Sequence, residues 1–285
     1  AHLIGSPNDD GVLRVLASKS NRHVGFHEGI RRAASYSELK KMNTYELSEV
    51  QKTTITGEDW ELRLGDSCEE MKSIESDSLD LAVFSPPFSN LYIYSDSVAD
   101  MGNCKNHSEF FQHFRYIAEE LYRTLTPGRI CAIHCKDLPL YKGRDGAAGL
   151  YDFPADIRAL FEEVGFVLHS RVTIWKCPVT EMTRTKAHGL LYKQLRKDSS
   201  YSRQGMADYV LFLRKWSKTD EDPKPITHTP ESFPLSEWQK YASPVWMDIK
   251  QQNVLNTAIA RDDKDEKHIC PLHLDVIERV IKMYS

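Results

Sequence analysis

Apolar residues recur along the chain with two periods, one typical of buried strands and one typical of helices. Residues 79–84 form a short, mostly apolar run of the kind that a parallel sheet buries on both faces. Residues 108–125 instead carry apolar side chains at helical spacing, with Ser108 as the expected N-cap and Pro127-Gly128 as the stop. Residues 152–164 repeat the helical pattern, and Gly165 follows as their C-terminal stop.

Further segments complete an alternation of strands and helices. A short helix is expected at 66–74, and a later amphipathic helix begins at Pro271 and continues to Ile281. The remaining strands are expected at 60–65, 129–135, 166–175 and 208–216. This order predicts an α/β fold with a doubly wound, mostly parallel, Rossmann-like sheet whose last two strands form an antiparallel pair.

Changes in composition divide the chain into an N-terminal arm and a main domain. The arm is expected at residues 1–58, and the main domain at residues 59–285. Within the main domain, a polar and basic insert at about 177–206 separates the last two strands, and a polar, proline-rich linker follows at about 217–234.

The overall composition is that of a globular protein. Hydrophobic residues make up 41% and charged residues 27% of the 285 positions. No run approaches the roughly 18 apolar residues that a membrane span needs, and the chain does not open on a basic and then apolar leader. The six cysteines lack CxxC spacing, so Cys131 and Cys135 are expected to be buried free thiols rather than zinc ligands. We therefore expect a cytoplasmic protein that binds no metal and no membrane.

The net charge of −4 is unevenly distributed. Residues 181–205 hold six basic and two acidic side chains, a local charge of +4, so that the rest of the chain totals −8. Tyr192 and Tyr201 lie between these charges, which suits contacts to phosphate groups; a solvated helix face is the alternative. The candidate DNA-binding residues are Arg184, Lys186, Lys193, Arg196, Lys197 and Arg203.

The expected strand at 79–84 ends abruptly in Ser85-Pro86-Pro87-Phe88. Two prolines cannot continue a sheet ladder, and they leave carbonyl oxygens free to accept hydrogen bonds. Open sheets bind ligands beyond the carboxyl ends of their strands, where this turn is expected. The Ser85 hydroxyl and an exposed Phe88 ring could hold a flat ligand that bears an amino group. For a Pro-Pro pair alone, a strand-ending turn with a buried Phe88 is the simpler interpretation.

The stretch from Leu62 to Phe88 contains a strand that ends in Gly-Asp and a second strand that ends in Ser-Pro-Pro-Phe. In this order and spacing it resembles the amino-methyltransferase family that modifies the exocyclic nitrogen of cytosine or adenine in DNA. The resemblance continues through Pro127-Gly128 and the last strand pair, and it resumes at residues 267–281. It implies a methyltransferase sheet and catalytic domain, S-adenosylmethionine as cofactor, and double-stranded DNA as partner.

The resemblance also implies roles for individual residues. Ser85 and the carbonyl of Pro86 would accept hydrogen bonds from the target amino group, and Phe88 would stack on the flipped base, with Pro87 completing the catalytic turn. A serine at the first position favours N4-cytosine over N6-adenine. The expected cofactor-binding residues are Asp66, Phe84, Ser85, His268, Cys270 and Pro271.

The glycine-rich F-x-G-x-G cofactor loop of the family does not occur in the sequence, and it would be expected just after Ser285. Several interpretations stay open, and the simplest is that the protein continues past Ser285 into this loop. Residues 1–58 could form a degenerate or permuted cofactor unit, or an unrelated arm with a helix around 33–42. A homodimer mate or partner chain could supply missing elements. The protein could also be a non-catalytic DNA-binding subunit, or methylate RNA or a protein amide.

Two further polar residues lie close to the expected carboxyl edge of the sheet. His134 falls within the apolar strand at 129–135 and is expected to be a hydrogen-bonded core histidine rather than a catalytic base. Asp137, just past that strand, could line the same cleft.

Overall fold

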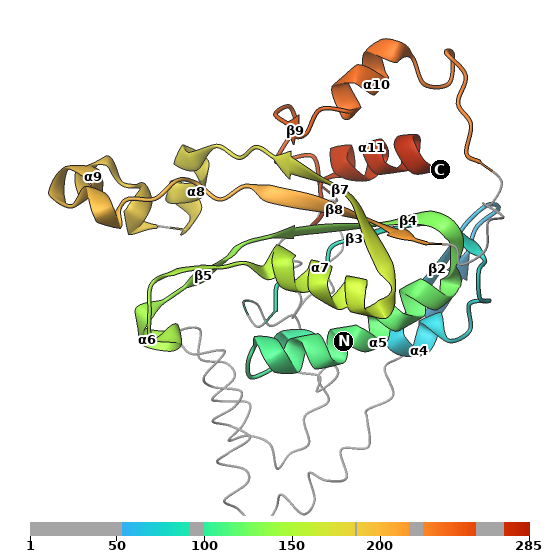
Figure 1. The fold of residues 1–285 in the computed structure, drawn as a ribbon, viewed down its shortest axis with the longest axis horizontal. Coiled ribbons are helices and arrows are strands. Elements are labelled where there is room, and N and C mark those ends of the chain that lie inside the picture. Colours follow the sequence, from blue (N-terminus) through green and yellow to red (C-terminus); the bar gives the residue numbers. More distant parts are fainter. Residues whose placement is uncertain (1–52, 90, 92–99, 186, 217–224, 255–270) are drawn as a thin grey trace, which may run out of the picture. The chain divides into compact units, whose positions relative to one another are not determined.

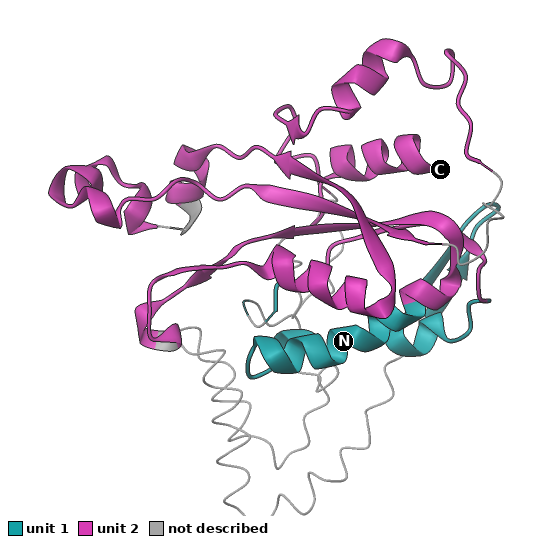
Figure 2. Ribbon diagram, viewed as in Figure 1, with its two compact units in different colours: residues 1–75, 87–120, 257–269 teal, residues 76–86, 121–256, 270–285 magenta. Residues whose placement is uncertain are grey.

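The computed structural model describes residues 53–89, 91, 100–185, 187–216, 225–254 and 271–285. The chain forms two units, coloured separately in Figure 2: the first holds residues 1–75, 87–120 and 257–269, and the second holds residues 76–86, 121–256 and 270–285. The predictions for the N-terminal arm fall almost wholly outside the described residues, so the division at residue 58 and the cofactor-unit interpretation stay predictions. His268 and Cys270 also lie outside them.

A five-stranded sheet forms the centre of the second unit (Figure 1). In spatial order its strands are β3 (Leu79–Phe84), β4 (Leu125–Lys136), β8 (Asp208–Lys215), β7 (Phe166–Ile174) and β9 (Val245–Trp246). β3 is parallel to β4 and β7 is parallel to β9, whereas β8 is antiparallel to both of its neighbours. The α/β fold and the antiparallel pairing of β7 with β8 are confirmed. The sheet is mixed because β8 alone runs against the other four strands.

Two helices cover opposite faces of this sheet. α11 (Leu274–Tyr284) lies on one face and α7 (Phe153–Val164) on the other (Figure 1). Because side chains alternate between the faces of a strand, every second residue of β4, β7 and β8 points toward α11. The core on that side consists of Ile130, Ala132, Val172, Ile174, Val210, Phe212, Trp246, Ile249, Val276 and Val280.

Local signals fix the helix ends. Asp152 caps α7, its Oδ1 accepting a hydrogen bond from the Ala155 amide at 3.0 Å, and Gly165 ends the helix with φ 122°, as the sequence predicts. α5 (His107–Thr124) begins one residue before the predicted cap. Its capping side chain is Asn106, which accepts from the amide of Glu109 at 2.9 Å, so the prediction of Ser108 is wrong.

The first unit shows where a strand pattern alone misleads. β2 (Glu61–Leu64) forms at the predicted place, but it pairs with β1 (Thr53–Thr56) in an antiparallel hairpin, and all of its residues are exposed. It is therefore not a strand of the five-stranded sheet among the described residues. The predicted helix after it is α4 (Ser67–Met71), and η1 (Met101–Asn103) completes the unit's regular structure ahead of α5.

The remaining elements of the second unit are short. β5 (Leu138–Leu140) and β6 (Gly149–Tyr151) form a hairpin around α6 (Lys142–Asp145). The basic insert folds into α8 (Pro178–Thr185), η2 (His188–Leu190), α9 (Tyr192–Lys197) and η3 (Ser199–Tyr201). α10 (Leu235–Tyr241) precedes β9, and α11 begins three residues after Pro271, where the sequence predicts its start. No helix among the described residues is long and apolar enough to cross a membrane.

Candidate active site

Ser85 lies at the carboxyl edge of the sheet, directly after β3. Phe84 is the register partner of Ile133 on the parallel strand β4, so the next residues, Ser85 and His134, come side by side. Alternation along β3 gives Ser85 the same face as Leu81 and Val83, which pack against the core under α11. The side chain of Ser85 is half-buried there.

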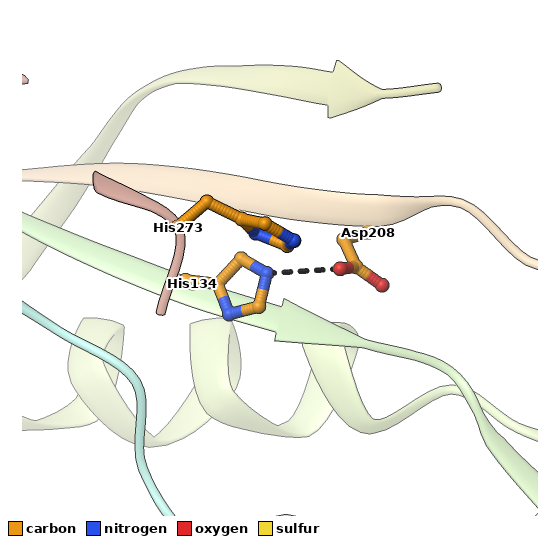
Figure 3. Close-up of side chains that lie close together, drawn as sticks. All are labelled: His134, Asp208 and His273. Carbon is orange, nitrogen blue, oxygen red and sulfur yellow. Dashed lines mark hydrogen bonds and ion pairs between the residues drawn. The ribbon is translucent and has the colours of Figure 1, made fainter. Parts of the chain in front are cut away.

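A chain of hydrogen bonds connects Ser85 to an acid on β8. Its Oγ lies 3.1 Å from His134 Nδ1, and His134 Nε2 lies 3.1 Å from Asp208 Oδ2. Figure 3 shows the second of these contacts as a dashed line between the two strands. Asp208 is the first residue of β8, and because β8 runs antiparallel to β4 its start lies at the edge where β4 ends. Topology, and not sequence proximity, therefore creates the contact.

Lys176 completes this chain of contacts. It follows β7, whose last residue Ile174 pairs with Asp208, and its ammonium group forms an ion pair with the Asp208 carboxylate. Burial alone would raise the pKa of Asp208, but the hydrogen bond from His134 and the charge of Lys176 hold that pKa well below its usual range. Asp208 is therefore a carboxylate at neutral pH, although it is only 1% exposed. We call these four residues the Ser85 network: Ser85, His134, Asp208 and Lys176.

His273 approaches the network from the N-terminal end of α11 (Figure 3). Its ring stands edge-on to the His134 ring, with 6.1 Å between the centroids. Burial lowers the pKa of His273 to about 4, and the nearby Lys176 and His134 act on it in the same direction. His273 Nδ1 and Asp208 Oδ1 are both buried without a hydrogen-bond partner.

The three side chains in Figure 3 also have the spacing of a metal site. The ligand atoms of His134, Asp208 and His273 all lie within 4.8 Å of one another. The Lys176 ammonium group, however, already neutralises Asp208 and would repel a divalent cation. We therefore interpret the group as a hydrogen-bonded network rather than as a metal centre.

The other residues of the predicted catalytic turn differ in exposure. Pro86 is buried and Pro87 is half-buried. Phe88 is only 3% exposed, so the expectation of an exposed ring face is wrong in this structure. Phe88 belongs to the first unit and Ser85 to the second.

Three of the predicted cofactor residues are described besides Ser85. Phe84 ends β3 and is half-buried, and Pro271 is half-buried ahead of α11. Asp66 belongs to the first unit, where its Oδ1 accepts hydrogen bonds from the amides of Cys68 at 2.8 Å and Glu69 at 3.3 Å. This capping role explains the aspartate locally, and the predicted cofactor contacts of all three stay predictions.

The basic insert presents part of its charge to solvent. Lys193, Arg196 and Lys197 are exposed on α9. Arg203 instead forms an ion pair with Glu181 at 3.0 Å, which joins the two ends of the insert. Lys186 and the side chain of Arg184 lie outside the described residues.

The burial of His134 and of the two central cysteines is as the sequence predicts. His134 is buried and hydrogen-bonded within β4, although the sequence does not predict that its partners include Ser85. Cys131 and Cys135 are buried free thiols, and burial raises the pKa of both. The sequence analysis missed Asp208, Lys176 and His273. Asp208 could have been found from strand alternation, because alternate residues of β3, β4 and β8 share one face of the sheet.

A comparison with protein families identifies the family of the chain. Residues 79–285 match the model of the N6/N4 DNA methylases. The chain belongs to this family. The match begins at β3 and so includes the Ser-Pro-Pro-Phe turn and the whole Ser85 network. The predicted family and enzyme class are thereby confirmed, as is S-adenosylmethionine as the cofactor of the family. No curated protein matches the chain.

Two structures of one protein support the methylase fold. TTHA0409 from Thermus thermophilus, named as a candidate DNA modification methylase and crystallised with S-adenosyl-L-methionine, is 20% identical with a TM-score of 0.54, over 78% of this chain and 72% of that one. Its selenomethionine derivative gives 19% identity and a TM-score of 0.52, over 78% and 73% of the two chains. The cytosine-N4-specific PvuII DNA methyltransferase is 19% identical with a TM-score of 0.48, over 78% and 68%.

Proposed function

We propose that this DNA methylase transfers a methyl group from S-adenosylmethionine to the N4 amino group of a cytosine flipped out of duplex DNA. The observation that carries the proposal is the Ser85 hydroxyl, held by His134 at the carboxyl edge of β3. An oxygen at this position is an acceptor that a base amino group can donate to. The preference for cytosine over adenine rests on serine at the first position of the turn.

The polar groups of the site are compatible with this cofactor. Among the described residues Asp208 Oδ1 is a buried carboxylate oxygen without a hydrogen-bond partner, so it can accept a hydrogen bond from a donor group of a bound ligand. Phe84 and Pro271 would contact the cofactor from β3 and from the segment before α11. When bound, S-adenosylmethionine supplies an electrophilic methyl group on a sulfonium sulfur.

The residues of the turn act on the target amino group. Ser85 Oγ and the carbonyl oxygen of Pro86 would each accept one of its N–H bonds. Two acceptors draw the nitrogen away from conjugation with the ring, so that its lone pair becomes available for attack. The rigid prolines fix both acceptors before the base arrives, which lowers the entropic cost of reaching the reactive geometry.

Labelled methyl transfer tests the proposal directly. The full-length protein is incubated with duplex DNA and S-adenosylmethionine labelled in its methyl group, and the DNA is digested to nucleosides. We expect the label in N4-methylcytosine, and a loss of roughly 100-fold in kcat for Ser85→Ala. Label in N6-methyladenine would overturn the base preference. Label in RNA or a peptide, with none in DNA, would support the alternative substrates instead.

We further propose that α9 contacts the phosphates of the DNA. Lys193, Arg196 and Lys197 are exposed there, and a protein loses affinity with salt in proportion to the phosphates that it neutralises. Replacing all three by Gln is expected to weaken DNA binding and to reduce the slope of log affinity against log salt by up to about 3. Lys142→Gln, exposed on α6, is the control and should change neither. An unchanged slope in the triple variant would exclude α9 from the interface.

A further inference from the structure

We infer that His134 accepts the proton released during methyl transfer, through Ser85, and that Asp208 is the positioning residue that orients the His134 ring. The inference rests on the proposed function and deepens it, because methylation of an amino group must dispose of a proton. It assigns this task to two buried side chains that lie outside the Ser-Pro-Pro-Phe turn.

The hydrogen-bond partners of His134 determine its tautomer. An ionised carboxylate can only accept, so the contact with Asp208 requires a proton on His134 Nε2. The other ring nitrogen of a neutral imidazole then carries a lone pair. His134 Nδ1 can therefore accept the Ser85 hydroxyl proton at 3.1 Å, and the His134 carbonyl oxygen, at 3.2 Å, is the other acceptor within reach of that hydroxyl. The lone pairs of Ser85 Oγ remain available to the amino group of a base.

A carboxylate faces the His134 ring from the neighbouring strand. Asp208 faces it from β8 with a negative charge, which Lys176, after β7, keeps ionised. His273 faces it from the segment before α11, and with its pKa lowered to about 4 it brings no positive charge at neutral pH. Ser85, after β3, is uncharged. An imidazolium at His134 would thus be paired with a carboxylate within 3.1 Å.

The proton balance of the reaction follows from these contacts. The new N–C bond uses the lone pair of the amino nitrogen, and the electron pair of the broken C–S bond stays on sulfur. The nitrogen is left with one proton too many. Ser85 Oγ takes that proton while it gives its own to His134 Nδ1, so that the hydroxyl is restored and the imidazole becomes an imidazolium. His134 then returns the proton to solvent after the product leaves.

Kinetics of His134→Gln test the role of the ring. A glutamine can still hydrogen-bond to Ser85, but it cannot accept a proton. We expect kcat to fall about 100-fold, with the KM for DNA and the affinity for S-adenosylmethionine within about twofold of wild type. His169→Gln is the matched control. His169 lies on β7 and is hydrogen-bonded to its neighbour Ser170, so it is not part of the Ser85 network. A His134→Gln enzyme with wild-type kcat, alongside an inactive Ser85→Ala enzyme, would overturn the inference and leave the proposed function intact.

Nitrogen NMR of histidine-labelled protein tests the tautomer without any turnover. We expect His134 to be protonated at Nε2 and bare at Nδ1. In Asp208→Asn the amide can donate to Nε2, which should move the proton to Nδ1 and lower kcat as in His134→Gln. A wild-type His134 protonated at Nδ1 would refute the inference. The NMR result tests the tautomer of His134 whether or not the wild-type protein methylates a base. A protein that methylates neither base would contradict the proposed function alone.

Discussion

His273 predicts a specific loss of stability in mild acid. The native protein holds its ring neutral, with a pKa of about 4, whereas an unfolded histidine titrates near 6.5. Between these values the unfolded chain binds a proton that the native chain does not, so stability is complete above pH 6.5 and falls as the pH drops toward 4. The cause is burial of the ring, together with the positive charge of Lys176.

The size of the effect follows from the two pKa values. A difference of about 2.5 pH units at about 1.4 kcal/mol per unit amounts to about 3.5 kcal/mol in total. Because His273 is only 7% exposed, solvent screens this penalty little. Lowering the pH from about 7.5 to about 5 should by itself cost about 2 kcal/mol, before the carboxylates Asp208 and Asp275 begin to titrate.

Urea unfolding of wild type and His273→Gln between about pH 7.5 and about pH 5 measures this contribution. We expect the wild-type free energy of unfolding to fall by about 2 kcal/mol more than that of the variant, with equal m-values. His113→Gln, on the exposed side of α5, is the control for the substitution itself and should follow wild type. If wild type and His273→Gln lose stability in parallel, His273 does not carry the penalty and the argument from its burial is wrong.

Three further substitutions test the fold by the same unfolding measurement. Phe212→Ala, which empties a fully buried core position, should cost about 3–5 kcal/mol. Asp152→Ala removes the acceptor for the Ala155 amide and should cost about 1 kcal/mol, whereas a cost near zero would show that water replaces the cap. Gly165→Ala should cost about 1–3 kcal/mol, because φ is 122° and a Cβ would lie 3.1 Å from the ring of Tyr122.

Elements with local start and stop signals could be predicted from the sequence. β3 occurs where its apolar run ends in two prolines, and α7 occurs between a capping aspartate and a glycine with positive φ. The predicted start of α5 was displaced because a second capping residue lies just before Ser108. Asn106 caps the helix, since its side chain reaches the Glu109 amide.

The pairing of β7 with β8 could be predicted, but the partner of β2 could not, because a strand pattern does not specify its neighbour. β2 has a clear strand pattern but pairs with β1 in an exposed hairpin. For Phe88 the sequence left an exposed and a buried ring open, since burial depends on segments that are remote in sequence, and the ring is buried. The same limit applies to the site: the turn identified Ser85, but nothing local connects it to Asp208, which lies 123 positions later.

The antiparallel hairpin of β7 and β8 explains why the Ser85 network and the basic insert lie at the same edge of the sheet. β7 ends and β8 begins at the edge where β3 and β4 end, so Lys176 and Asp208 necessarily flank His134. The chain between these two residues is the basic insert, which therefore leaves and re-enters the sheet at that same edge. One topological feature thus supplies both the acid that orients His134 and the attachment of α9.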